Sequence, residues 1–317
     1  MIVGAFYLLF IVGDAMSSTP HPAADQMLAA ARWWVDACRI IREVKQDSGL
    51  INQEADSSGT GLIGVEYTPI TTTLGSLKAK QISENPDFAA LIVRWLWSVG
   101  VRKGDRVAVS LSGSFPGLNL AVLAAVHAMH LHAIIISSLG SSSWGANQPE
   151  MTWADMEKLL LDKGMISEGS AAMTMGGGGD WGGGLSLDGK EILFNKIRKS
   201  KAKFLDAESL DQAIGMKLKL YGDLDQYKCF INVGGGQAAL GRGPGGRSLP
   251  TGLLKRFPED GPYESGEVDG LVFYFLRQHI PVIHLLEIHR IAKDWGISTS
   301  WKPYIEPGKS QVYFMEK

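Results

Sequence analysis

Three glycine- or serine-rich segments contain the side chains and backbone groups of this sequence that are best suited to binding or catalysis. They are residues 112–117 (SGSFPG), 176–184 (GGGGDWGGG) and 232–236 (NVGGG), and each follows a short apolar run. In α/β proteins the chain leaves the carboxyl end of a strand through such a turn, where its backbone N–H groups can bind an anion. Glycine lets the backbone approach a ligand closely and adopt a positive φ. We therefore predict a ligand-binding site at these loops.

The first segment offers hydroxyl groups as well as backbone amides. It follows residues 106–111 (RVAVSL), which are typical of a buried strand, and alternation would place Ser110 and Ser112 on one face. Ser114 is expected to cap the helix that follows, which has a proline in its first turn. We predict that Ser112, Gly113 and Ser114 bind a carboxylate or a phosphate. The alternative is that Ser114 only caps the helix and that the other serines form hydrogen bonds in the core.

The loop after the next predicted strand would lie beside the first segment at the same edge of the sheet. It covers residues 137–147 (SSLGSSSWGAN), in which Ser141, Ser143 and Asn147 could line a pocket. Serine, glycine and asparagine are also frequent in turns, so a purely structural loop is the alternative.

Residues 66–73 (EYTPITTT) combine an acid with a cluster of hydroxyl groups after another short strand candidate. Thr71 and Thr72 could bind a polar ligand, and Glu66 could act as a general base. The alternative is an edge loop that binds nothing.

The glycine run at residues 176–184 surrounds a single acid, Asp180. Gly177 and Asp180 are candidate ligand contacts if the backbone approaches a ligand here. The run could also be a mobile lid or a disordered insertion. No Gly-Lys-Ser or Gly-Lys-Thr follows it, so it is not the phosphate-binding P-loop.

Residues 232–236 match a dinucleotide-binding loop only loosely. Asn232, Gly234 and Gly235 follow a strong strand candidate and are further candidate ligand contacts. However, the glycine spacing departs from G-x-G-x-x-G, and no acid follows at the end of a strand about 20 residues on. We therefore predict neither a nicotinamide nor any other cofactor.

A serine nucleophile is a second interpretation of the same loops. Ser112 or Ser114 would attack the substrate, with support from Glu66, Asp180 or His284. The sequence around these serines is not the G-x-S-x-G nucleophile elbow. The histidine spacing is also not that of a metal site, and we predict no bound metal.

The composition is that of an ordinary globular protein. Of the 317 residues, 45% are hydrophobic and 20% charged, and this length suffices for one large domain or two smaller ones. The net charge of −2 gives no indication of nucleic-acid binding. Cys38 and Cys229 form neither a disulfide framework nor a metal motif, so we expect packed thiols.

Residues 1–13 (MIVGAFYLLFIVG) are uniformly apolar. They are short for a membrane span and are similar to the hydrophobic region of a signal peptide, although no basic residue precedes them. We expect a signal-like segment or a short membrane anchor with a linker over residues 1–22. The protein would then be extracytoplasmic, either membrane-associated or secreted. The alternative is an apolar element that packs on the domain.

Helix-like and strand-like segments alternate along the rest of the chain. We expect one α/β domain over residues 23–317, with a possible subdivision near residues 150–165. The predicted helices cover residues 23–45, 86–99, 116–129, 152–163, 188–199, 209–221, 267–279 and 288–295. The predicted strands cover residues 62–67, 106–111, 133–138, 171–175, 203–205, 227–233, 281–285 and 311–314. This alternation predicts a mostly parallel, Rossmann-like sheet with helices on both faces and the glycine- and serine-rich loops at one edge.

Several stretches in combination resemble the bacterial family called poly-gamma-glutamate system protein. They are residues 61–66 (GLIGVE), 71–77 (TTTLGSL), 112–116 (SGSFP), 144–147 (WGAN), 179–180 (GD) and 232–236 (NVGGG). The resemblance extends over most of the chain from about residue 32 onward. It implies a role in making, exporting, trimming or retaining an anionic polymer of glutamate, and it supplies no catalytic residues.

The resemblance and the loops together suggest one main function. We expect an accessory protein of poly-gamma-glutamate synthesis or export that binds glutamate-type carboxylates at the glycine- and serine-rich loops. Its partners would be the polymer or a glutamate-like small molecule, with components of a membrane synthase as further candidates, and no nucleic acid. One alternative is a hydrolase or transferase that acts on γ-glutamyl amide bonds. Another is a non-catalytic scaffold for a membrane synthase.

Overall fold

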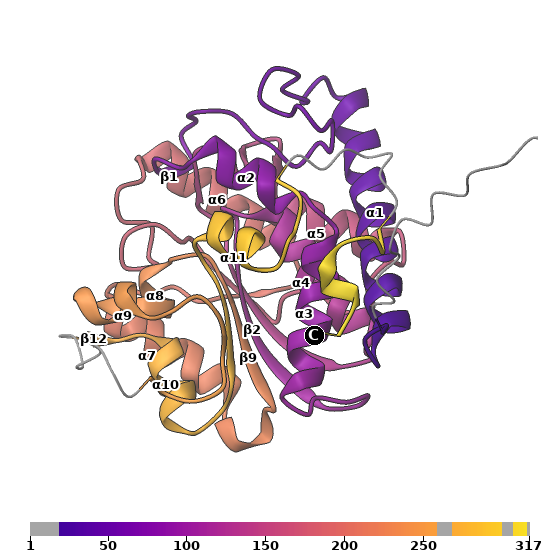
Figure 1. Ribbon diagram of the computed structural model, residues 1–317. Coiled ribbons are helices and arrows are strands. Elements are labelled where there is room, and N and C mark those ends of the chain that lie inside the picture. The colour runs from indigo at the N-terminus through magenta and orange to yellow at the C-terminus, as the bar shows by residue number, and fades with distance from the viewer. Residues whose placement is uncertain (1–18, 259–267, 300–306, 316–317) are drawn as a thin grey trace, which may run out of the picture.

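A seven-stranded sheet runs through the centre of the structure (Figure 1). The computed structural model describes residues 19–258, 268–299 and 307–315. The strand order is β11-β13-β9-β2-β3-β7-β8, and every neighbouring pair is parallel except the antiparallel pair β11 and β13. The predicted α/β fold with a mostly parallel, Rossmann-like sheet is therefore confirmed.

The elements alternate along the chain as the sequence predicted. The strands of the main sheet are β2 (Arg106–Ser112), β3 (His132–Ser138), β7 (Ala172–Thr174), β8 (Lys203–Phe204), β9 (Cys229–Val233), β11 (Gly252–Leu254) and β13 (Val282–Leu285). The short paired strands are β1 (Thr71–Thr73) with β4 (Ser141–Ser142), β5 (Asn147–Gln148) with β6 (Met151–Thr152), and β10 (Gly241–Arg242) with β12 (Val268–Asp269). The helices are α1 (Ala24–Asp47), α2 (Leu77–Ser83), α3 (Asp87–Ser98), α4 (Pro116–Ala128), α5 (Trp153–Asp162), α6 (Leu187–Lys199), α7 (Leu210–Tyr221), α8 (Gln237–Leu240), α9 (Pro244–Ser248), α10 (Leu271–Arg277) and α11 (Ile288–Asp294). Two 3-10 turns are η1 (Leu224–Gln226) and η2 (Gln311–Tyr313).

Side chains of the central strands alternate between two hydrophobic clusters. On β2, Val107 and Val109 pack in the cluster that contains α1, α3 and α4, whereas Ala108 packs in the cluster with α7 and α10. Figure 1 shows α3 and α4 on one side of β2 and β9 and α7 and α10 on the other. Because successive residues of a strand point to opposite faces, a strand buried on both faces is apolar at nearly every position. The apolar runs that identified these strands have this cause.

The connections change direction between β2 and β9. From β2 the chain adds β3, β7 and β8 on one side, and it then returns across the sheet through α7 to add β9 on the other side of β2. In open α/β sheets, such a switch point leaves a crevice at the carboxyl ends of the two strands. The topology therefore places the best candidate site where β2 and β9 end.

Several predicted helix starts are confirmed, and one is wrong. Thr152 and Asp155 form a capping box at α5, and the hydroxyl of Ser209 accepts a hydrogen bond at the start of α7. Helix α4 begins at Pro116, but its N-cap residue is Phe115, which makes no side-chain cap. The Ser114 hydroxyl does not cap α4, because it accepts a hydrogen bond from the Ser142 N–H at 3.0 Å.

Residues 62–67 form no strand in the structure. Their polar backbone is bonded by a side chain in place of a neighbouring strand: Asn147 Oδ1 accepts from Val65 N at 3.0 Å, and Asn147 Nδ2 donates to Val65 O at 2.7 Å. One buried amide thus satisfies backbone groups that a sheet would otherwise satisfy.

Other segments also differ from the prediction: of the expected helix at residues 267–279, Val268–Asp269 form β12 and Leu271–Arg277 form α10. Residues 69–80, which fell outside the predicted helices and strands, contain β1 and the start of α2, whose N-cap residue Ser76 accepts from Ala79 N. The expected last strand at residues 311–314 is the 3-10 turn η2. There Arg94 donates to the carbonyl oxygens of Val312 and Phe314, so these groups are bonded without a strand.

The two ends of the described chain meet. Met315 N donates to Thr19 O at 2.8 Å, His21 N donates to Tyr313 O at 2.9 Å, and Pro20 and Phe314 form an isolated β-bridge. Residues 1–18, which contain most of the predicted signal-like segment, lie outside the described residues. Among the described helices, none has both the length and the apolar character needed to cross a membrane.

Candidate functional site

A cleft of about 490 Å³ lies at the carboxyl ends of the central parallel strands. Seven of the predicted ligand contacts line it, and they come from four separate loops: Thr72, Ser112, Ser114, Gly177, Asp180, Asn232 and Gly235. Ser110 also lines it, on the same face of β2 as Ser112. The edge at which the sequence placed the loops is therefore where the structure brings them together.

Lys80 and Ser142 form a direct side-chain contact in this cleft, and the sequence analysis identified neither of them. Lys80 is 3% exposed and extends from α2 so that its Nζ lies 2.8 Å from Ser142 Oγ on β4. The same Nζ donates to the Ser114 carbonyl and lies 3.6 Å from the centroid of the Phe115 ring. Burial lowers the pKa of Lys80 from its ordinary value of 10.5 to about 7. In the described part of the chain, no carboxylate forms an ion pair with Lys80.

Asp180 and Lys217 form a second buried group on another wall of the cleft. The Lys217 ammonium lies 2.5 Å from Asp180 Oδ2, which has no other partner within the described ranges. Asp180 Oδ1 accepts from the Ser138 hydroxyl at 2.6 Å and from the Thr174 hydroxyl at 3.0 Å. The carboxylate charge is thus neutralised and hydrogen-bonded inside the protein, which is the condition for burying it.

The glycine run at residues 176–184 is a closed loop beside this group. Gly178 and Gly183 exchange backbone hydrogen bonds of 2.8 and 3.0 Å, and Gly179 N donates to Gln237 Oε1 at 2.6 Å. Asp180 has a φ of +67°, in the left-handed region. The loop therefore turns Asp180 inward to Lys217 and is fixed to α8 through Gln237.

In the part of the chain that the structure describes, the predicted nucleophiles Ser112 and Ser114 bond to backbone amides and to no base. Ser112 Oγ accepts from Ser114 N at 3.2 Å, and Ser114 Oγ accepts from Ser142 N. Within the described residues, no hydrogen bond joins either hydroxyl to a histidine or a carboxylate. Gly113 uses its N–H on Ser138 O at 2.8 Å, so it belongs to the backbone framework of the turn.

His284 on β13 lies beside Asn232, its register partner on β9, and does not line the cleft. The ring Nδ1 of His284 is 3.0 Å from Asn232 Nδ2, which also donates to Gly234 O at 2.8 Å. His284 is fully buried, and burial lowers its pKa to about 4, so the imidazole is neutral at neutral pH. It positions the Asn232 side chain and does not contact the predicted serines.

The other candidate residues support the cleft without lining it. Asn147 Nδ2 donates to Thr71 Oγ1 at 3.0 Å, Ser141 Oγ donates to Ser142 O at 2.8 Å, and Ser143 Oγ lies 3.5 Å from Thr73 O. Gly234 has a φ of +84° and donates its N–H to Leu285 O. Glu66 is exposed on the segment before β1 and does not line the cleft.

Two of the missed residues left signals in the sequence. Lys217 lies in the buried stripe of α7 formed by Leu210, Ala213, Ile214 and Tyr221, where a charged side chain is unusual and needs a partner. Ser76 could have marked the start of α2 and hence the helical position of Lys80. No local pattern points to Ser142, because its contact with Lys80 joins residues 62 positions apart.

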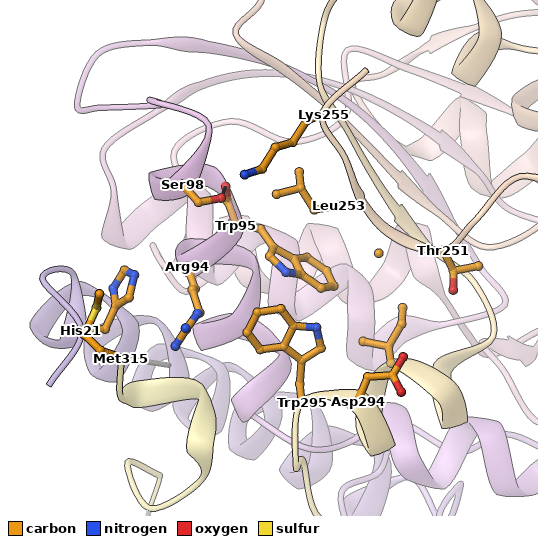
Figure 2. A pocket seen from close by; sticks show the side chains of 12 residues that line it. His21, Arg94, Trp95, Ser98, Thr251, Leu253, Lys255, Asp294, Trp295 and Met315 are labelled. Carbon is orange, nitrogen blue, oxygen red and sulfur yellow. Dashed lines mark hydrogen bonds between the residues drawn. The ribbon is translucent and has the colours of Figure 1, made fainter. Parts of the chain in front are cut away.

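A second cavity, of about 510 Å³, lies between α3, α11 and β11 and has a different chemistry (Figure 2). Arg94 and the tryptophans Trp95 and Trp295 line it, and the two indoles meet edge to face at 5.8 Å. The Arg94 guanidinium holds η2 through Val312 O at 2.8 Å. Arg94 therefore joins the C-terminal segment to α3, and we assign this second cavity a structural role.

No protein-family model, no curated protein and no solved structure matches the chain. No group of three or more His, Cys, Asp or Glu side chains within the described ranges could hold a metal ion. The fold and the cleft define the class: a Rossmann-like α/β protein with a candidate ligand site at the carboxyl edge of its sheet.

Proposed function

We propose that this chain binds glutamate-type carboxylates in the cleft at the ends of β2 and β9, as an accessory protein of poly-gamma-glutamate synthesis or export. The observation that carries the proposal is Lys80, a buried ammonium that lines the cleft without an acidic partner in the described structure. The identity of the ligand as a glutamate polymer is inferred from the sequence resemblance, and the preference for an anion is inferred from the charges of the cleft. The apolar residues 1–13 support an extracytoplasmic location.

The charges that line the cleft favour an anionic ligand. Lys217 and Asp180 neutralise each other, and at the outer rim Arg247 and Glu287 are both exposed and of opposite sign. Lys80 is the charge that remains. An isolated buried ammonium is costly, because it has lost its water without gaining a counter-charge. A bound carboxylate would supply that counter-charge, and the hydroxyl of Ser112, which accepts from Ser114 N, is available as a hydrogen-bond donor.

The lowered pKa of Lys80 gives the binding a distinct pH dependence. The carboxylates of the ligand are ionised above about pH 5. Lys80 is mostly charged below its pKa of about 7 and mostly neutral above it. Affinity should therefore be high between about pH 5 and 7 and should fall as the pH rises further. An exposed lysine, with its ordinary value of 10.5, would not produce this loss.

A titration of the full-length chain with poly-gamma-glutamate at low salt tests the proposal. Lys80→Met removes the charge with little change of shape, and we expect it to weaken binding by about tenfold or more. Lys78→Met is the matched control, because Lys78 is exposed on the same helix and does not line the cleft. Equal affinities of Lys80→Met and the wild type would overturn the proposed site.

A further inference from the structure

We propose that Ser142 is a nucleophile for acyl transfer and that Lys80 is its general base, acting on an amide or ester of a carboxylic acid bound in the cleft. The choice of a γ-glutamyl amide as the substrate rests on the proposed function. The assignment of the two residues does not, because it depends only on their own geometry.

The Ser142 hydroxyl is both reachable and directly bonded to its base. Ser142 and Lys80 line the cleft, and their Oγ and Nζ atoms are 2.8 Å apart. This distance is in the range needed for proton transfer between a nucleophile and a base. The backbone of Gly75 passes close by, and a Cβ at that position would lie 2.7 Å from the Ser143 carbonyl oxygen and 2.9 Å from Ser142 Oγ. Glycine at this position therefore avoids a clash with the backbone just after β4 and with the Ser142 hydroxyl.

Ser142 is also fixed in place more firmly than a surface serine. Its N–H donates to Ser114 Oγ at 3.0 Å, and its carbonyl accepts from Ser141 Oγ at 2.8 Å. The Ser114 hydroxyl therefore positions the backbone of Ser142, which accounts for a serine at position 114 without making it the nucleophile. Ser112 and Ser114 bond to backbone N–H groups, whereas Ser142 bonds to an amine.

Lys80 can accept a proton because of what surrounds it. A base must be neutral before it acts, and a lysine ammonium has donors but no acceptor. Burial lowers the pKa of Lys80 to about 7, so both forms are present near neutral pH. The Lys80 side chain faces the Phe115 ring and the Ser114 carbonyl, which belong to the turn that precedes α4. The other charged groups that line the cleft are the paired Lys217 on α7 and Asp180 in the glycine loop, Arg247 on α9, and Glu287 before α11. Other charged or titratable side chains of the neighbouring helices do not line it: Lys78 on α2, and His289, Arg290, Lys293 and Asp294 on α11.

The reaction balances with water as the only co-reactant. Ser142 Oγ forms a bond to the carbonyl carbon as its proton passes to Lys80 Nζ, and the carbonyl π pair moves to oxygen. That pair returns as the C–N bond breaks, and the departing amine takes the proton from Lys80. Water then attacks the acyl-serine with Lys80 as the base, the bond to Oγ breaks, and Oγ regains a proton.

Asn232 indicates an amide in preference to an ester. It lines the cleft, it is buried, and its Oδ1 has no hydrogen-bond partner within the described residues. A buried acceptor of this kind normally has a donor. An ester has no N–H, whereas an amide substrate brings one.

Labelling of the full-length chain with a fluorophosphonate, followed by peptide mass mapping, tests the nucleophile. We expect the label on Ser142, at a rate that rises with pH and levels off above pH 7, as Lys80 loses its proton. Ser142→Ala should abolish the label, and Lys80→Met should slow labelling by about a hundredfold or more. Ser143→Ala is the matched control and should react like the wild type, because Ser143 does not line the cleft. A label on Ser112 or Ser114, no label on any serine, or a Lys80→Met rate equal to the wild type would each overturn the inference.

Lys80→Arg separates this inference from carboxylate binding. Arginine keeps the positive charge but cannot act as a base at neutral pH. We expect Lys80→Arg to retain binding of poly-gamma-glutamate and to lose the label on Ser142. Binding without any label in the wild type would leave the proposed function standing and remove the nucleophile. Labelling on Ser142 without binding of the polymer would support the nucleophile and remove the proposed function. Thermal unfolding of each variant identifies any loss of reactivity caused by misfolding.

Discussion

Lys80 and Lys217 are two buried lysines at the same edge of one sheet, and they differ in what faces the ammonium group. Lys217 lies 2.5 Å from the carboxylate of Asp180. Lys80 faces a hydroxyl, a carbonyl oxygen and an aromatic ring. Lys217 is 1% exposed and Lys80 is 3% exposed, so burial does not distinguish them. The two lysines differ in the partner of the ammonium group.

The comparison teaches how a buried charge can be assigned a role. A paired and hydrogen-bonded lysine is fully explained by the fold, because removing its partner would leave an uncompensated charge. A lysine whose pKa is lowered by burial, and which faces a cleft without a counter-charge, is a candidate for binding or proton transfer. In this protein both kinds lie in one cleft, so each serves as the control for the other.

Lys217→Met should have the largest effect on stability. It would leave the Asp180 carboxylate buried with only two hydroxyl donors, and we expect the free energy of unfolding to fall by about 3–5 kcal/mol. Denaturant unfolding measures this loss. The double variant Lys217→Met with Asp180→Asn should recover much of it, since the uncompensated charge is then gone. A loss below about 1 kcal/mol in the single variant would show that the pair is not essential to the fold.

Lys80→Met should flatten the dependence of folding stability on pH. The pKa of Lys80 is about 7 in the folded chain and 10.5 in its ordinary state, so between these values the unfolded chain binds more protons. Wild-type stability should therefore gain up to about 1.4 kcal/mol per pH unit from this group as the pH rises through that window. The Lys80→Met variant lacks this gain, and its profile over the same range should be flatter. Parallel profiles of the two proteins would show that Lys80 is charged throughout.

Ser138→Ala and Ser142→Ala extend the comparison to the two hydroxyls and should have the smallest effects. Ser138 donates to the Asp180 carboxylate at 2.6 Å, and losing a hydrogen bond to a buried charge costs about 1.5–3 kcal/mol. Ser142 bonds to a lysine that can release its proton, so we expect a cost of about 1 kcal/mol or less. Thermal or denaturant unfolding of both variants compares them directly. A larger loss for Ser142→Ala would mean that its bond to Lys80 is mainly structural.

The sequence predicted the sheet well because the central strands are determined by local composition. The runs at residues 106–111 and 227–233 are mostly apolar, as is expected of strands buried on both faces. The helix starts at Thr152 and Ser209 were also readable, because a cap and its partner lie within one turn. The loops that follow these strands could then be placed at one edge by topology alone.

The chemistry of the cleft could not be predicted in the same way. Helix α2 has only seven residues, too few for its period to stand out against the threonine-rich segment before it. The strand expected at residues 62–67 failed because Asn147, far along the chain, takes the place of a neighbouring strand. The contact between Lys80 and Ser142 likewise depends on how two distant segments pack. Such contacts are long-range, and one sequence contains no local sign of them.

The meeting of Thr19 with Met315 has a topological consequence. A backbone hydrogen bond and the bridge between Pro20 and Phe314 already join these ends, and Arg94 on α3 holds the C-terminal side of this seam through the Val312 carbonyl. The described fold is therefore close to a closed ring, and linking its ends would not require the sheet to move. A pull on the chain at residue 19 would act first on this seam and on α3. Helix α2 and strand β4, which hold Lys80 and Ser142, lie outside this seam.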